Sequence, residues 1–137
     1  MASGQCFCGA VRIEVSAPPK WVAHCHCSMC RRAHMAGYVT WAGFPKASVR
    51  VAAGADLLAT YKSSPEARRQ FCSACGSQLF FWHERYADEA HIPRAVFPGD
   101  IGMAPKSHIY FTDRAGWIDV HDDLRKKGGP TGLEPLP

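Results

Sequence analysis

Apolar and polar residues alternate over short stretches of this chain, a pattern that predicts β-strands in place of long helices. The run Val11-Arg12-Ile13-Glu14-Val15 changes character at every residue, as a strand with one buried and one exposed face does. Other short runs rich in β-branched and aromatic residues predict strands at 38–41, 49–52, 58–61, 78–82 and 108–112. Proline and glycine lie between these runs, so turns are expected to connect them.

Helical patterns are short and few. A turn or two of helix is expected at 29–34 and around 65–69, and no internal repeat or heptad pattern is present. The C-terminal segment is rich in glycine and proline and lacks a periodic apolar face, which is typical of a loose tail. We therefore expect one mostly β domain of short antiparallel strands at residues 1–124, followed by a flexible tail at residues 125–137.

The cysteine content indicates metal binding. The chain of 137 residues has seven cysteines, and its first residues have neither the basic nor the apolar segment of a secretory signal. No apolar run approaches the ~20 residues that span a bilayer, so we expect a cytoplasmic protein without a membrane partner. Disulfides are disfavoured in that compartment, and an odd number of cysteines cannot all pair. Clustered thiols are therefore expected to be metal ligands.

The net charge bears on the kind of partner. The formal charge of +4 is modest. If the thiols bound two divalent zinc ions as seven thiolates, the ions and thiolates together would contribute a charge of −3, and the metal-loaded protein would be close to neutral. The basic residues are scattered along the chain and do not follow one element. A nucleic-acid partner is therefore not expected.

The cysteines form three tight clusters: a first pair (Cys6 and Cys8), a triplet (Cys25, Cys27 and Cys30) and a second pair (Cys72 and Cys75). Thiolates at this spacing can close short chelate loops around zinc, which takes four ligands in a closed structural site. Alternate residues of a regular strand lie ~7 Å apart, so the first pair must occupy a turn or bulge. The numbers predict one site with four thiolates and a second site with three.

Spacing alone leaves two ways to share these ligands. Cys27 and Cys30 could join the second pair as in a zinc ribbon, although 41 residues lie between them against about 15–20 in that pattern. Alternatively, the first pair joins the second pair, and the triplet wraps one ion from a single loop. The second arrangement is geometrically more economical, but spacing does not exclude the first.

Five stretches carry a resemblance to a known family, and they follow the family's order: 4–12 (Gly-Gln-Cys-Phe-Cys-Gly-Ala-Val-Arg), 25–32 (Cys-His-Cys-Ser-Met-Cys-Arg-Arg), 61–64, 69–80 and 105–117. Through them the chain resembles the glutathione-dependent formaldehyde-activating (Gfa-like) family, whose zinc-binding domain also occurs in centromere protein V. The stretch 97–103 departs from the turn common in that family, which affects the contour of the pocket but not the metals.

The resemblance implies a mostly β fold of the Mss4-like β-tent type, with zinc sites at strand ends and turns. It implies one structural zinc on Cys6, Cys8, Cys72 and Cys75, and a second, catalytic and more labile zinc on Cys25, Cys27 and Cys30. It also implies carbon–sulfur lyase chemistry, because the type enzyme joins glutathione and formaldehyde into S-hydroxymethylglutathione.

The chemistry of an open three-thiolate zinc agrees with that activity. A soft centre with one open position favours a thiol as its fourth ligand and deprotonates it, so a small thiol such as glutathione is the expected partner. Two alternatives stay open. A histidine (His24, His26 or His34) could close the site as a fourth protein ligand, or the protein could be a non-enzymatic zinc-binding module for protein or nucleic acid.

An anionic thiol also needs cations for its carboxylates. Arginine suits bidentate carboxylate recognition, and the candidate contacts near the cysteine clusters are Arg31, Arg32, Lys62, Arg68 and Arg69. The large aromatic residues are expected mainly in the core: Trp41, Phe44, Phe80, Trp82 and Trp117.

Overall fold

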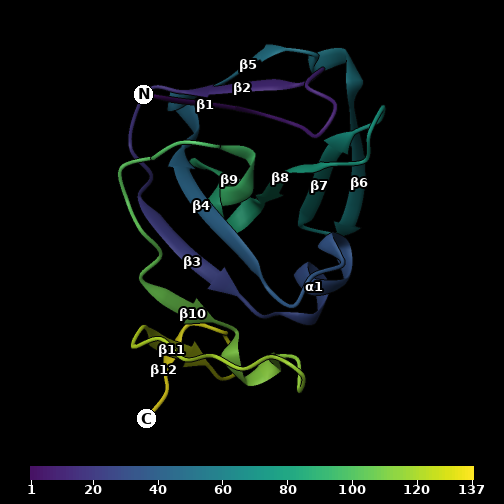
Figure 1. Ribbon diagram of the computed structural model, residues 1–137. Helices are drawn as coiled ribbons and strands as arrows, with labels where there is room; N and C mark the ends of the chain where they lie inside the picture. The colour runs from purple at the N-terminus through teal and green to yellow at the C-terminus, as the bar shows by residue number, and fades with distance from the viewer. The chain divides into compact units, whose positions relative to one another are not determined.

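Strands dominate the computed structural model, which describes all 137 residues (Figure 1). They are β1 (Ala2–Gln5), β2 (Arg12–Val15), β3 (Trp21–Cys25), β4 (Val39–Pro45), β5 (Val49–Ala53), β6 (Leu58–Ser64), β7 (Ala67–Cys72), β8 (Gln78–His83), β9 (Glu89–Pro93), β10 (Ser107–Ile109), β11 (Arg125–Gly128) and β12 (Glu134–Pro135). The one α-helix is α1 (Ser28–His34), and the 3₁₀ turns have three residues each. The expectation of a mostly β, Mss4-like fold with cysteine clusters at strand ends and turns is confirmed.

The chain divides into two units. The first unit comprises Met1–Lys20 and Ala42–Met103, and the second comprises Trp21–Trp41 and Ala104–Pro137. The residues of β4 are shared between them. Both pairs of cysteines belong to the first unit, and the triplet belongs to the second.

The first unit contains two sets of antiparallel strands. One is a three-stranded sheet in the order β1-β2-β5, and the other runs β9-β8-β7-β6 (Figure 1). In β2 the side chains of Ile13 and Val15 are buried while Arg12 is exposed, so the predicted period of two is confirmed. Glu14 on the outer face pairs with Arg50 of β5, the residue opposite it in the ladder.

The prediction of a helix around 65–69 is wrong. Strand β6 ends at Ser64 and β7 begins at Ala67, so Pro65 and Glu66 form the turn of a hairpin. Burial alternates from Ala67 (buried) through Arg68 (exposed) to Arg69 (buried). Strand pairing on both sides of β7 outweighs the weak helical propensity of its first residues.

The second unit places three strands in parallel. Strand β10 pairs in parallel with β3 on one side and with β11 on the other, and β12 pairs antiparallel with β11. The expected flexible tail at residues 125–137 therefore carries two short strands, because ladder hydrogen bonds between backbones require no apolar periodicity. The strand expected at 108–112 is shorter, since Tyr110 has a φ of 52° and the chain turns there.

The large aromatic residues are only partly in the core. Trp41, Phe44 and Phe80 are buried as expected. Trp82 is half-buried, and Trp117 is 73% exposed, so the expectation of a core position is wrong for Trp117. No helix of the structure is long and apolar enough to cross a membrane.

Candidate functional site

Two tight turns of the first unit bring four thiols together. The turn between β1 and β2 carries the first pair and is closed by a hydrogen bond from the Gly9 N–H to the Cys6 carbonyl at 3.0 Å. The turn between β7 and β8 carries the second pair and is closed by the Gly76 N–H, which donates to the Cys72 carbonyl at 2.7 Å. Gly9 and Gly76 have φ values of 80° and 81°, a region in which side chains are strained, so both turns favour glycine.

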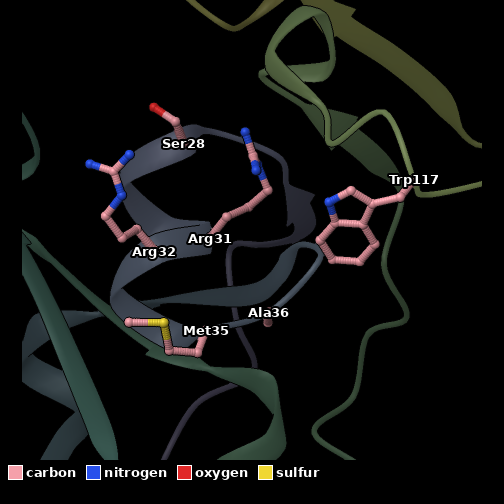
Figure 2. Close-up of a pocket in the computed structure, with 6 residues that line it drawn as sticks. All are labelled: Ser28, Arg31, Arg32, Met35, Ala36 and Trp117. Carbon is pink, nitrogen blue, oxygen red and sulfur yellow. The ribbon is translucent and has the colours of Figure 1, made fainter.

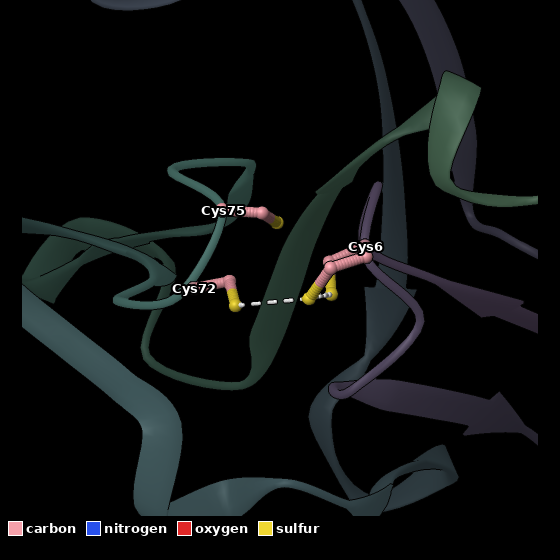
Figure 3. Close-up of side chains that lie close together, drawn as sticks. Cys6, Cys72 and Cys75 are labelled. Atoms are coloured by element: carbon pink, nitrogen blue, oxygen red, sulfur yellow. Dashed lines mark hydrogen bonds between the residues drawn. The ribbon is translucent and has the colours of Figure 1, made fainter.

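The four sulfur atoms lie at distances that fit one zinc ion. The Sγ atoms of Cys6, Cys8, Cys72 and Cys75 all lie within 4.8 Å of one another. Cys6 Sγ is 3.6 Å from Cys8 Sγ, which is 3.9 Å from Cys72 Sγ. Figure 3 shows Cys6 facing Cys72 and Cys75. Four sulfurs placed tetrahedrally at ~2.3 Å from zinc would be separated by about 3.8 Å. All seven cysteines are free thiols, so no disulfide competes for these ligands.

The electrostatic environment prepares only part of this group for metal binding. The Ser77 hydroxyl lies 3.2 Å from Cys75 Sγ, and together with backbone hydrogen bonds it lowers the pKa of Cys75 to about 5. A hydrogen bond from the backbone of Ala10 lowers the pKa of Cys8. The Cys6 thiol, burial and the Cys75 and Cys72 thiols together outweigh it and raise that pKa to about 11. A divalent cation would compensate the charge that opposes full ionisation.

The triplet is gathered by a strand end and the first turn of a helix. Strand β3 ends at Cys25, and Cys27 is the N-cap of α1, where its Sγ accepts a hydrogen bond from the Cys30 N–H at 3.2 Å. The three Sγ atoms lie within 4.8 Å of one another. Cys25 and Cys30 are buried, whereas Cys27 is half-buried and is the member that solvent reaches best. The neighbouring Cys27 and Cys30 thiols, and then burial, raise the pKa of Cys25 far above its usual range.

No histidine, aspartate or glutamate joins the three thiols of the triplet. His24 Nδ1 lies 2.8 Å from the Thr40 hydroxyl, and His26 Nε2 lies 2.8 Å from His108 Nδ1. The ring of His34 meets the ring of Trp41 edge-on, with centroids 5.2 Å apart. Each of these three histidines makes contacts within the second unit, and none of them places a ring nitrogen among the three thiols.

A buried chain of side chains starts between the ligands of the triplet, and the sequence did not predict it. His26, which is fully buried, contacts His108, and His108 Nε2 lies 2.9 Å from Asp122 Oδ2. Burial first, and then His108, lower the pKa of His26 to about 4, so its ring is neutral at pH 7. The hydrogen bond from His108 lowers the pKa of Asp122. His26 and His108 are 82 positions apart, and no local pattern indicates their contact.

A pocket of about 360 Å³ opens beside the helix that follows the triplet. It is lined by Ser28, Arg31, Arg32, Met35, Ala36 and Trp117. Figure 2 shows both arginines projecting from α1, while Trp117 comes from a separate loop. Arg31 donates from Nε to the His26 carbonyl at 3.1 Å and from Nη2 to the Asp113 carbonyl at 2.9 Å. These two bonds fix its guanidinium in the lining of the pocket.

The remaining cationic candidates belong to the first unit. Arg69 is buried with its guanidinium over the Phe81 ring at 4.7 Å, and Arg68 lies over the Trp82 ring at 5.4 Å. Lys62 is exposed on β6. Of these five cationic side chains, Arg31 and Arg32 line the pocket beside α1, and the other three do not.

The comparisons with known proteins decide the family. The family model described as glutathione-dependent formaldehyde-activating enzyme matches residues 1–113. The chain belongs to this family. The resemblance stated from the sequence motifs is thereby confirmed, and Asp122 lies beyond the residues that the family model matches.

Individual proteins similar to this member of the Gfa-like family agree with the family assignment. A Halomonas elongata protein named "Putative glutathione-dependent formaldehyde-activating enzyme" is 27% identical over 127 residues, which cover 88% of this chain and 81% of the relative. An uncharacterized lyase of Schizosaccharomyces pombe is 27% identical over 116 residues, or 85% of this chain and 82% of the relative. The crystal structure of a Rhodobacter sphaeroides protein aligns with a TM-score of 0.62 at 29% identity, covering 75% of this chain and 97% of that one.

Proposed function

We propose that this protein is a zinc-dependent carbon–sulfur lyase-type enzyme that acts on a thiol adduct, as in the joining of glutathione and formaldehyde into S-hydroxymethylglutathione. The observation that carries the proposal is a triplet of gathered thiols, one of them half-buried, which no other protein side chain completes. Membership of the Gfa-like family and the name of the yeast lyase support the reaction class. A cytoplasmic location remains a prediction of the sequence.

The two groups of thiols are proposed to have different roles. Cys6, Cys8, Cys72 and Cys75 would saturate one zinc ion and leave no place for a substrate, which is the property of a structural site. Cys25, Cys27 and Cys30 would leave one position open, so theirs is the catalytic and more labile site. Cross-linking two turns that are 64 positions apart is the contribution of the first site to the fold.

Zinc held by the triplet would supply a binding place for the substrate sulfur and keep that sulfur deprotonated near neutral pH. In the proposed reaction the substrate thiol would give its proton to solvent, and its sulfur would form a carbon–sulfur bond to the carbonyl carbon of formaldehyde. The carbon–oxygen π pair moves to the oxygen, which takes up a proton from solvent, and the reverse steps cleave the adduct. Burial of Cys25 and Cys30 leaves the side of Cys27 as the approach for the sulfur.

The pocket on α1 is proposed to hold the anionic part of the thiol. Arg31 lies one turn of helix after Cys27, and its N–H donates to the Cys27 carbonyl at 3.0 Å. The Arg31 guanidinium donates to two backbone carbonyls and still has N–H groups left for a carboxylate. Arg32, the next residue, is exposed. A peptide-like thiol with carboxylates, such as glutathione, matches two guanidinium groups flanked by the apolar surface of Met35 and Trp117.

The test is the variant Cys27→Ser compared with Met29→Ala, a substitution of a neighbouring exposed side chain outside both thiol groups. Wild-type protein and Met29→Ala should each hold two zinc equivalents, and Cys27→Ser should hold one. Exchange NMR should show that wild type and Met29→Ala accelerate the interchange of formaldehyde with glutathione. Cys27→Ser should lose at least ~100-fold of that acceleration, the scale of an essential metal-site group.

Unchanged zinc content and exchange in Cys27→Ser would contradict the proposal. Arg32→Ala provides a second measurement, since it should raise KM for glutathione about tenfold while leaving both zinc equivalents in place, on the scale of one hydrogen bond to a charged group. Absence of exchange in every variant, with a salt-dependent shift of duplex DNA, would instead favour a non-enzymatic zinc-binding module.

A further inference from the structure

Three side chains form a continuous hydrogen-bonded chain from the surface to the centre of the triplet segment. The carboxylate of Asp122 lies 3.1 and 2.9 Å from His108 Nε2, and His108 Nδ1 lies 2.8 Å from His26 Nε2. His26 and His108 have exposed fractions of 0% and 1%, while the side chain of Asp122 is 42% exposed. His26 stands directly between Cys25 and Cys27 in the sequence.

The chemistry of these contacts fixes which ring nitrogens carry protons. A carboxylate only accepts, so His108 must donate from Nε2. In the contact between the two rings, His26 Nε2–H is the donor and His108 Nδ1 the acceptor, at 2.8 Å. His26 Nδ1 is left bare, and this atom is indeed buried without a hydrogen-bond partner. The opposite tautomer of His26 would bury an orphan N–H, which proteins avoid more strictly than an unfilled acceptor.

The same three residues belong to backbone elements that hold the triplet segment. His108 is paired with His24 in the parallel ladder of β3 and β10, and the His26 N–H donates to the Ile109 carbonyl at 3.0 Å. Asp122 precedes β11, and its Oδ1 accepts the Leu124 N–H at 3.0 Å. Strand β11 in turn pairs with β10, so the C-terminal segment brings this carboxylate beside His108.

We propose that Asp122 is a positioning residue for the triplet: through His108 it sets the tautomer and orientation of His26 and thereby the conformation of the segment that carries Cys25 and Cys27. The carboxylate comes from a part of the chain that the family model does not match. The role is positional, because Asp122 touches neither the thiols nor the pocket lining. This inference rests on the proposed function only for its effect on metal binding.

The test compares Asp122→Asn with Asp123→Asn, which changes the adjacent exposed carboxylate that takes no part in the hydrogen bonds between Asp122, His108 and His26. Asparagine keeps the shape of Asp122 but can donate as well as accept, so it no longer dictates the proton on His108. In ¹⁵N NMR, wild type and Asp123→Asn should show His26 protonated at Nε2 alone, and Asp122→Asn should show mixed tautomers. Titration with a competing chelator should show zinc at the triplet bound about tenfold more weakly in Asp122→Asn, the low end for groups that orient metal ligands.

The zinc shared by the two pairs is the internal reference and should keep its affinity in all three proteins. Cobalt substitution adds a spectroscopic signature, since altered thiolate-to-cobalt bands of the triplet alone are expected in Asp122→Asn. Ring nitrogens or triplet affinity indistinguishable from those of Asp123→Asn would overturn the inference. Should wild type bind a single zinc, the proposed function fails, and the inference is judged on hydrogen exchange of the His26 and Cys27 amides, which Asp122→Asn should speed about tenfold on the scale of one charge-assisted hydrogen bond.

Discussion

Replacing Cys8 by serine should destabilise the first unit by weakening a metal cross-link, at little cost in packing. Cys8 is exposed, so the substitution itself removes few contacts. With a metal bound, Cys8 and Cys72 close a loop of 64 positions. The chain-entropy relation for a closed loop of this length gives about 4 kcal/mol at 25 °C. Cys6 still ties the same turn to the ion in Cys8→Ser, so the free energy of unfolding of the zinc-loaded protein should fall by up to that amount.

The assay is urea unfolding of wild type, Cys8→Ser and the control Phe7→Ala, each with zinc and with a chelator. Phe7 is 91% exposed in the same turn, so its removal should cost less than about 0.5 kcal/mol. With the chelator, wild type and Cys8→Ser should unfold alike.

Two results would refute this reasoning. Equal unfolding free energies of zinc-loaded wild type and Cys8→Ser would show that Cys8 closes no metal cross-link. A difference that persists in the chelator would assign the cost to the Cys8 side chain itself and not to a bound ion.

Three other substitutions test separate features of the structure. Gly54→Ala should lower the free energy of unfolding, measured in urea, by at least about 2 kcal/mol, because Gly54 has a φ of 76° and a Cβ there would clash with the Ala10 carbonyl. The control Gly99→Ala should be near neutral, because a Cβ at Gly99 meets nothing within 4 Å. Equal losses in the two variants would contradict the argument. Ser77→Ala should shift acid-induced zinc release from the four-thiol site to higher pH, because loss of the Ser77 hydroxyl raises the lowered pKa of Cys75 and protons then compete with zinc for that sulfur at higher pH. Zinc release followed with a colorimetric chelator measures the shift, and a shift to lower pH would refute the argument. Trp117→Ala should change stability by less than about 0.5 kcal/mol because its side chain is exposed, yet raise KM for glutathione; an unchanged KM would separate Trp117 from the substrate pocket.

Strands with alternating apolar residues were predictable because their burial follows from a local rule. The run from Val11 to Val15 satisfies that rule, and β2 lies within it at Arg12–Val15. Strand β7 breaks the rule, since Arg69 is buried and the residues before it favour a helix. Strands β11 and β12 lack apolar alternation altogether. They form nevertheless, because their pairing with β10 and with each other uses backbone groups.

The sequence by itself determined the ligand chemistry. Seven thiols in three clusters indicate a soft metal, since chelation depends on residue type and on spacings of one or two positions. The motifs around them also identified the family, which the match over residues 1–113 confirms. Spacing alone left open which clusters share an ion, because the two pairs are separated by a long stretch of chain.

Only the tertiary structure decided which residues meet. It gathered the first pair with the second pair through two turns of the first unit, and it left the triplet together at the start of α1. It also joined His26 to His108 and Asp122, and it exposed Trp117 beside the arginines of α1. These contacts span tens of residues and depend on strand register, which the pairing of the whole chain sets and no local pattern records.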